Sequence, residues 1–270
     1  MKTILNSNDL VKKIKHIKNL GFVPTMGSIH DGHISLIKKS IKNCNKTLVS
    51  IFINPKQFNK KNDFKKYPKK INKDLSIFKK FKVDYVFIPK INDIYNYKRS
   101  KQIRLNKKDK ILCAKYRKGH FEGVLDVMDR LTKLVNPKKV FMGKKDFQQF
   151  ILVKKYIKKK YNIKVIGCPT IRDKNKVALS SRSLLLNKKQ LFIANQIIRD
   201  LFNFKNKFRK SKNINHLLKI KKIELQDKYK IKIEYLENRK INNLEKINNF
   251  NQSKIFIAYY INQVRLIDNL

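Results

Sequence analysis

Short apolar runs alternate with segments of helical period along the first two thirds of this 270-residue chain. The apolar runs have the length and the β-branched or aromatic content of buried strands. They cover residues 21–24, 47–54, 83–89, 140–143 and 164–170. Between them, apolar spacing predicts a helix over residues 121–135, closed by Pro137, and another over residues 146–157. Strands that alternate with helices predict a parallel sheet, which binds ligands beyond the carboxyl ends of its strands.

The pattern of apolar positions changes after about residue 175. The elements predicted beyond this point are helices over residues 184–208 and 205–222 and strand-like runs over 231–236, 255–261 and 264–268. The second of these helices is rich in lysine and carries little sign of a binding site. The fold is therefore predicted to be α/β, with a parallel-sheet domain over residues 1–174. A small α+β domain of two or three strands is predicted over residues 175–270.

Composition narrows the class of protein. A hydrophobic content of 41% is enough for one large core or two modest domains. No run approaches the roughly 18 apolar residues of a membrane span, and the polar N-terminus does not resemble a signal peptide. We therefore expect a cytoplasmic protein with no membrane partner. The cysteines Cys44, Cys113 and Cys168 are odd in number and form no CxxC pair, which predicts buried thiols rather than disulfides or a zinc site.

The charge of the chain is extreme, with 66 Lys and Arg against 19 Asp and Glu, a net charge of +47. Such a balance normally suggests a nucleic-acid partner. Here the lysines are spread along the whole sequence together with abundant Asn, Ile, Phe and Tyr, the residues with A/T-rich codons. We interpret the charge as mutational bias and expect no nucleic-acid partner. Self-repulsion at this charge predicts a fold whose stability depends on salt.

The most informative segment is GFVPTMGSIHDGH, residues 21–33. A predicted strand breaks at Pro24 into a turn that contains Gly27, and His30 and His33 follow three residues apart. The apolar residues placed on one face of the next helix are Ile34, Leu36, Ile37 and Ile41. A strand, a tight turn and a helix point backbone N–H groups and a positive dipole end at an anion, and two imidazoles on one helix face could donate to it.

This segment matches neither a GxxxxGK[ST] loop nor a GxGxxG fingerprint, so its chemistry should differ from that of P-loop kinases and Rossmann dehydrogenases. A His-x-x-His pair alone is also typical of an ordinary surface or half of a metal site. Four further polar segments support a binding site, and they are NPKQF at 54–58, GHFEGV at 119–124, GKKDFQQ at 143–149 and ALSSR at 178–182. The loops that begin at Thr25, Asn54, Gly143 and Thr170 each follow a predicted strand.

Each of these segments is weak by itself, but in this order they resemble the pantothenate synthetase (pantoate–β-alanine ligase) family. The resemblance covers residues 21–186 and returns in RLIDN at 265–269. It implies a Rossmann-like ATP- and pantoate-binding domain over 1–174 and a small C-terminal lid domain over 175–270. It also implies that ATP adenylates (R)-pantoate, that β-alanine then attacks pantoyl adenylate to give pantothenate and AMP, that Mg²⁺ accompanies ATP, and that the enzyme is a homodimer.

The resemblance assigns roles to residues by matching position. Catalytic roles fall on His30, His33 and Lys145, with His33 as the proton donor. The implied ATP-binding residues are Met26, Gly27, Ser28, Ile29, His30, Asp31, Gly32, His33, Gly143, Lys144, Lys145, Asp146, Ile171, Leu179, Ser180, Ser181 and Arg182. Gln57 and Gln149 would bind pantoate, with Gln57 also at the β-alanine site, and Asp74 is a candidate Mg²⁺ ligand.

The chain departs from the family pattern at four positions. Lys144 stands where glutamate is usual, and Leu179 where methionine is usual. Lys73 precedes Asp74 where a second acid is common, which weakens the metal assignment. Asp126 occupies a threonine position on the long helix.

Two other classes of protein are weighed against this interpretation. A different nucleotidyltransferase of the HxxH superfamily would share residues 21–33 and transfer AMP or CMP to a phosphate acceptor. It would leave the Asn-Pro-x-Gln-Phe segment and Gln149 unexplained. A basic nucleic-acid-binding protein would carry aromatic and lysine residues together on one face, and its affinity would fall steeply with salt.

Overall fold

The computed structural model describes residues 1–59, 64–65, 67–95 and 102–270. The chain divides into two compact units, and each is described by itself below. The first unit comprises residues 1–144 and 149–169, and the second comprises residues 145–148 and 170–270. The domain bounds 1–174 and 175–270 stay a prediction.

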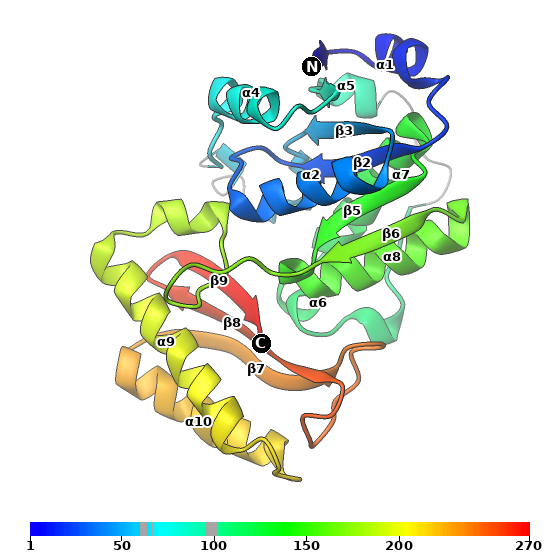
Figure 1. The fold of residues 1–270 in the computed structure, drawn as a ribbon. Helices are drawn as coiled ribbons and strands as arrows, with labels where there is room; N and C mark the ends of the chain where they lie inside the picture. Colours follow the sequence, from blue (N-terminus) through cyan, green and yellow to red (C-terminus); the bar gives the residue numbers. More distant parts are fainter. Residues whose placement is uncertain (60–63, 66, 96–101) are drawn as a thin grey trace. The chain divides into compact units, whose positions relative to one another are not determined.

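The first unit is built on a six-stranded sheet in the order β1-β4-β3-β2-β5-β6, in which every pairing is parallel (Figure 1). Its strands are β1 Lys2–Ile4, β2 Leu20–Thr25, β3 Lys46–Ile51, β4 Tyr85–Phe87, β5 Lys139–Gly143 and β6 Lys164–Cys168. The five strands that apolar runs predicted are confirmed. The sequence analysis missed β1, because three residues with one buried side chain give no readable alternation.

Helices connect these strands. They are α1 Ser7–Ile14, α2 Asp31–Asn43, α4 Ile71–Lys80, α5 Ile91–Ile94, α6 Cys113–Tyr116, α7 His120–Val135 and α8 Phe147–Tyr161. Short 3-10 turns lie at η1 Pro55–Gln57, η2 Lys107–Asp109 and η3 Lys144–Asp146. The two long helices predicted over 121–135 and 146–157 are confirmed as α7 and α8. Helix α7 is buried on most of its surface, whereas surface helices expose a polar face.

The buried face of α2 includes a polar residue, Ser40. Leu36, Ile37 and Ser40 are buried, whereas Ile41, which the spacing placed on the same face as Leu36 and Ile37, is 41% exposed. The reason lies in the sheet, since a Cβ at Gly21 of β2 would overlap the Ser40 hydroxyl. The helix therefore approaches β2 through a small residue, and that hydroxyl is satisfied by Thr47 at 2.9 Å.

Strand β2 contains Pro24, which is unusual in the middle of a sheet. The Leu20 carbonyl accepts a hydrogen bond from Lys138, next to β5, and alternate residues of a strand face the same way. Pro24 therefore faces β5, but the pairing of β2 with β5 stops at Phe22. Pro24 has no N–H to donate toward β5, and it lies two residues beyond the last paired position of β2 with β5.

The second unit packs two helices on a three-stranded antiparallel sheet. The helices are α9 Lys188–Lys207 and α10 Ile214–Tyr229, and the strands are β7 Lys232–Lys240, β8 Ser253–Ile261 and β9 Val264–Asn269. The prediction of one helix across 205–222 was wrong, because α9 ends at Lys207 and α10 begins at Ile214. Ser211 accepts a hydrogen bond from the Asn213 backbone in the connection, and such polar side chains favour turns over helix interiors. Likewise, residues 184–187 precede α9 and lie in or next to the 3-10 turn η4 Ser181–Leu185.

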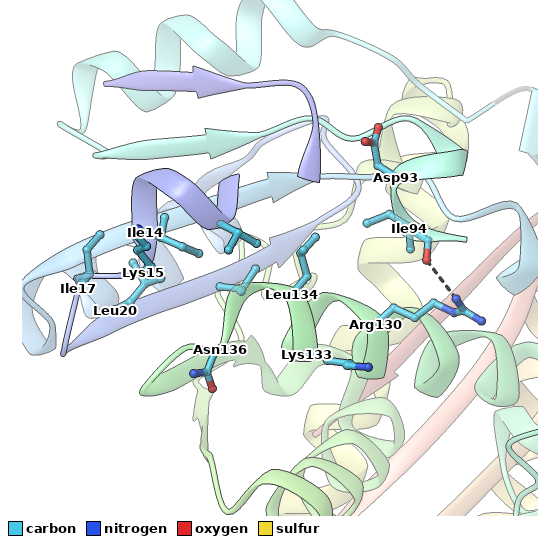
Figure 2. A pocket seen from close by; sticks show the side chains of 12 residues that line it. Ile14, Lys15, Ile17, Leu20, Asp93, Ile94, Arg130, Lys133, Leu134 and Asn136 are labelled. Carbon is cyan, nitrogen blue, oxygen red and sulfur yellow. Dashed lines mark hydrogen bonds between the residues drawn. The ribbon is translucent and has the colours of Figure 1, made fainter. Parts of the chain in front are cut away.

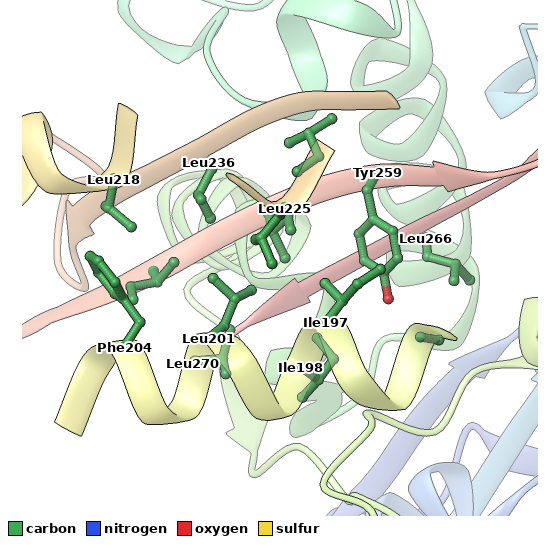
Figure 3. Packing of buried hydrophobic residues seen from close by; sticks show 14 of the residues in the cluster. Ile197, Ile198, Leu201, Phe204, Leu218, Leu225, Leu236, Tyr259, Leu266 and Leu270 are labelled. Carbon is green, nitrogen blue, oxygen red and sulfur yellow. The ribbon is translucent and has the colours of Figure 1, made fainter. Parts of the chain in front are cut away.

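Apolar residues of α9 recur every three or four positions and face the sheet. Figure 3 shows Ile197 of this helix directed toward Tyr259 of β8, Leu201 toward Leu225 of α10 and Phe204 toward Leu218 of α10. Burial raises the pKa of Tyr259, which keeps its hydroxyl neutral inside this core. Among the described residues, none of the helices combines the length and the apolarity that crossing a membrane requires.

The three cysteines are thiols that lie outside any disulfide in the described part of the chain. Cys113 and Cys168 are buried and Cys44 is half-buried. Burial raises the pKa of Cys168, and the positive charges of Lys39 and Lys144 oppose this only in part. The thiol therefore stays protonated and unreactive near neutral pH.

Candidate active site

The order of the strands fixes where a ligand is expected in the first unit. From β2 the chain proceeds to β3 and β4 on one side, then returns to β5 on the other side of β2. Ligands of parallel sheets bind where the strand order reverses, beyond the carboxyl ends. Residues 26–33, which follow β2, and Gly143, the last residue of β5, lie at this point, and both were predicted to bind ATP.

The loop after β2 is organised by Asp74 of α4. One carboxylate oxygen of Asp74 accepts a hydrogen bond from the Ser28 amide at 2.8 Å, and the other accepts one from the Ile29 amide at 2.9 Å. The side chain is only 1% exposed. Gly27 has a φ of 80° and Ser28 a φ of 54°, so both occupy the left-handed region. Consecutive amides that converge on one anion form a nest, and here the protein's own carboxylate fills it.

This contact changes the interpretation of the loop. The expectation was that its backbone amides would face a phosphate. Instead the amides of Ser28 and Ile29 bind Asp74, and the Gly27 amide donates to the Thr25 hydroxyl at 3.2 Å. The amides of Gly27, Ser28 and Ile29 are therefore engaged by the protein itself.

His30 and His33 lie at the start of α2, with ring centroids 4.1 Å apart. The Nδ1 of His30 accepts a hydrogen bond from the Gly32 amide at 3.1 Å, and the Nδ1 of His33 accepts one from the His30 amide at 3.4 Å. A ring nitrogen that accepts carries no proton, so each neutral imidazole holds its proton on Nε2. The reciprocal cap thus sets both rings in the tautomer whose outer nitrogen is a donor.

Gln57 ends the 3-10 turn η1, which follows β3. Its Nε2 lies 2.7 Å from the Met26 sulfur, so the predicted pantoate residue contacts the predicted ATP loop. The Asn54 side chain accepts from the Lys56 amide and donates to the Gly123 carbonyl at 3.0 Å, which joins η1 to α7. Gln149, the other predicted pantoate residue, lies half-buried in α8 of the same unit.

Two of the residues that depart from the family pattern, Asp126 and Lys144, have contacts within the first unit. Asp126, at the threonine position, pairs with Arg130 at 3.0 Å and with Lys56 at 3.6 Å. Lys144, at the usual glutamate position, packs against Gly167, where an added Cβ would lie 2.9 Å from its side chain.

The remaining predicted residues belong to the second unit. Lys145 Nζ lies 3.6 Å from the carboxylate of Asp146. The Ile171 carbonyl accepts a hydrogen bond from the Leu179 amide at 3.0 Å, at the end of a short antiparallel bridge. The Ser180 hydroxyl caps η4 by accepting from the Arg182 amide at 3.2 Å. Ser181 and Arg182 are half-buried in the same turn.

The last strand, β9, ties these segments together. Asp268 binds Arg172 through two hydrogen bonds of 2.7 and 2.9 Å, and Arg172 also donates to the Asn269 carbonyl. The Asn269 side chain donates to the Lys145 carbonyl at 2.7 Å. The closing RLIDN motif therefore anchors the backbone of the predicted catalytic lysine and the residue that follows Ile171.

A cavity of about 440 Å³ in the first unit does not coincide with this chemistry. Figure 2 shows it lined by α1 and the turn after it, by the second half of α7, and by Asp93 and Ile94. The Arg130 guanidinium at its edge is already engaged by the Ile94 carbonyl at 3.2 Å and by Asp126. None of its lining residues is among those predicted to bind ATP or pantoate.

The described residues do not build a metal site of their own. Among them, His, Cys, Asp and Glu side chains nowhere gather in groups of three or more suited to a metal ion. Both oxygens of Asp74 serve backbone amides, and its neighbour is Lys73 rather than an acid. These residues therefore do not fit a protein-held Mg²⁺, which prefers several oxygen ligands in octahedral geometry.

Comparison with known proteins decides the family. The family model described as pantoate–β-alanine ligase matches residues 1–270. The chain belongs to this family. A pantothenate synthetase of Pseudothermotoga lettingae is 35% identical over 272 residues, which cover 100% of this chain and 97% of the relative.

Solved structures of pantoate–β-alanine ligases agree with this assignment and confirm the predicted fold class. The pantothenate synthetase of Thermus thermophilus superposes with a TM-score of 0.92 at 27% identity, and the match covers 100% of this chain and 99% of that one. The enzyme from Francisella tularensis, complexed with β-γ ATP and β-alanine, has a TM-score of 0.86 at 35% identity and covers 100% of this chain and 97% of that one.

Sequence reasoning missed several residues of this chain that hold the predicted site. The loop contact of Asp74, the contacts of Arg117 and His120 with Gln57, and the anchoring by Asp268 and Asn269 were not foreseen. The sequence feature that could have indicated these contacts was a polar residue inside an apolar element, such as His120 at the start of a buried helix. Their partners lie tens of residues away in the sequence.

Proposed function

We propose that this chain condenses (R)-pantoate with β-alanine at the expense of ATP, and that it does so through pantoyl adenylate. The observation that carries the proposal is the family match over all 270 residues. A family member 35% identical to this chain is complexed with β-γ ATP and β-alanine, which supports both as substrates here. Retention of the HxxH loop, of Gln57 and Gln149, and of Lys145 supports the same conclusion.

The chemistry explains why ATP is needed. A carboxylate is a poor electrophile at neutral pH. In the first step a carboxylate oxygen of pantoate attacks the α-phosphorus of ATP, and the bond from that phosphorus to the departing pyrophosphate breaks. In the second step the amine of β-alanine attacks the acyl carbon, loses a proton, and displaces AMP. Such transfers depend mainly on alignment and on stabilisation of charge.

The proposed roles follow from the donors on each unit. His30 and His33 would donate from Nε2 to the phosphates, as their Nδ1 contacts favour, with His33 as the principal donor. Lys145 would neutralise the triphosphate. Gln57 and Gln149 would orient pantoate, since an amide both donates to a carboxylate and accepts from a hydroxyl.

The rest of the ATP site is also proposed from the family pattern. Gly143 and Asp146 would hold the ribose, Ile171 would contact adenine through its backbone, and residues 179–182 would close on the phosphates. We further propose a homodimer in the cytoplasm, where ATP is available. Mg²⁺ remains an expectation of the resemblance, and no step is assigned to it.

One experiment tests the proposed function directly. Exchange of labelled pyrophosphate into ATP is measured without β-alanine, in the presence and absence of pantoate. Exchange that requires pantoate is the expected result. Exchange that requires a phosphate acceptor instead would indicate a different HxxH nucleotidyltransferase, and no exchange with any acceptor would overturn the proposal.

A further inference from the structure

The position of Gln57 depends on the first turn of α7. Gly123 allows η1 to lie directly on this helix, since a Cβ there would overlap the Lys56 carbonyl. The Asn54 side chain spans the same contact, donating to the Gly123 carbonyl at 3.0 Å and lying 3.4 Å from Gln57 Oε1. The turn that carries Gln57 is thus fixed against α7 by backbone contacts.

His120, the first residue of α7, makes the shorter of two contacts with the Gln57 carbonyl, to which Arg117 also donates from 3.4 Å. His120 is 7% exposed. Its Nδ1 lies 2.7 Å from the Gln57 carbonyl oxygen, and its Nε2 lies 2.8 Å from a guanidinium nitrogen of Arg117. Gly119, with a φ of 79°, begins the helix in a conformation that favours glycine and so sets the direction in which His120 leaves the chain.

The partner on Nε2 settles where the imidazole proton lies. A guanidinium has five N–H donors and no acceptor, so Nε2 must accept the hydrogen bond from Arg117. The ring is therefore neutral, its proton is on Nδ1, and Nδ1–H donates to the Gln57 carbonyl. This is the opposite tautomer from that of His30 and His33.

We propose that His120, held in the Nδ1–H tautomer by Arg117, is a positioning residue that fixes Gln57 for pantoate and β-alanine. The inference rests on the proposed function, because Gln57 is its target. The contact fixes the Gln57 backbone at one end, while Asn54 and Met26 contact its side-chain amide at the other. Because the backbone and the side-chain amide of Gln57 are both held before substrate binds, the amide loses little conformational freedom on binding.

The test compares two substitutions at this position. His120→Phe keeps a ring of similar size without a donor, whereas His120→Asn keeps an amide N–H close to the place of Nδ1. We expect His120→Phe to raise KM for pantoate and β-alanine about tenfold, the factor given by one hydrogen bond of ordinary strength. KM for ATP should stay within about twofold in both variants, and His120→Asn should restore most of the loss in the substrate KM values.

Controls separate this role from general destabilisation. Val127→Ala, further along the buried face of α7, should lower stability without changing KM for pantoate, β-alanine or ATP. Nitrogen-15 NMR of histidine-labelled protein should show one Nδ1–H tautomer that disappears in His120→Asn. Arg117→Met should release that tautomer and raise the pantoate KM, even if His120→Phe does not fold.

Three outcomes would overturn the inference. They are an unchanged pantoate KM in His120→Phe, an equal rise in the ATP KM, and an Nε2–H tautomer at His120. Failure of the proposed function is distinguishable, because it would show as absent pantoate-dependent exchange in the unsubstituted enzyme.

Discussion

Asp74 offers the sharpest test of how the histidine loop is held, and Asp74→Asn is the informative change. The carboxylate accepts from two amides at 2.8 and 2.9 Å in a site that is 1% exposed. An asparagine has one acceptor oxygen, so one amide keeps a weaker, uncharged hydrogen bond. The other amide would face an NH₂ group and be buried without an acceptor.

The magnitude follows from these contacts. A hydrogen bond to a charged group contributes about 1.5–3 kcal/mol, and a buried donor left without a partner costs about 1–3 kcal/mol. We therefore expect the free energy of unfolding to fall by about 2–4 kcal/mol, which a domain stable by about 5–15 kcal/mol survives. Ser28, held at a φ of 54°, would then relax and displace His30. KM for ATP should rise and kcat should fall.

The assay combines urea unfolding with pyrophosphate exchange over a range of Mg²⁺ concentrations. Asp84→Asn is a matched control, since Asp84 accepts from the Thr47 amide at 2.9 Å at the opposite end of the sheet. It should lower stability by about 1 kcal/mol and leave KM for ATP unchanged. The reasoning is refuted if Asp74→Asn unfolds within about 0.5 kcal/mol of wild type while its Mg²⁺ requirement rises, because that result identifies a metal ligand.

Three further predictions concern single side chains. His33→Ala should lower turnover on the order of 10²-fold with an unchanged circular dichroism spectrum, and wild-type turnover would remove His33 from the mechanism. Gly123→Ala would place a Cβ against the Lys56 carbonyl, so urea unfolding should show a loss of about 1–3 kcal/mol together with a higher pantoate KM; unaltered values for both would contradict the close packing of η1. Burial, with a hydrogen bond to Asp129, raises the pKa of Tyr161 to about 12, so its contribution to stability is complete below about pH 10 and is lost as the pH rises toward 12. The difference in unfolding free energy between wild type and Tyr161→Phe should be about 1 kcal/mol at pH 8 and shrink above pH 10, and a constant difference would refute this assignment.

Local pattern was enough to predict most of the framework. Strands β2 to β6 of the parallel sheet, α7 and α8, and the three C-terminal strands follow from apolar runs and periods, because each element buries a face that its own residues encode. Errors fell where the local signal was weak or misleading. Strand β1 was too short to show alternation, and Ile41 lies outside the core because Ser40 takes the close approach to Gly21. The family pattern likewise supplied the candidate residues.

The sequence by itself determined which elements form and which residues are candidates for chemistry. Only the tertiary structure decided how those candidates are held. The contact of Asp74 with Ser28 spans 46 positions, that of His120 with Gln57 spans 63, and that of Asn269 with Lys145 spans 124. Periodicity reports which face of an element is buried, but hydrogen bonds depend on atoms that meet only when distant segments pack. The tautomers of the histidines and the occupant of the amide nest therefore became visible only in the folded chain.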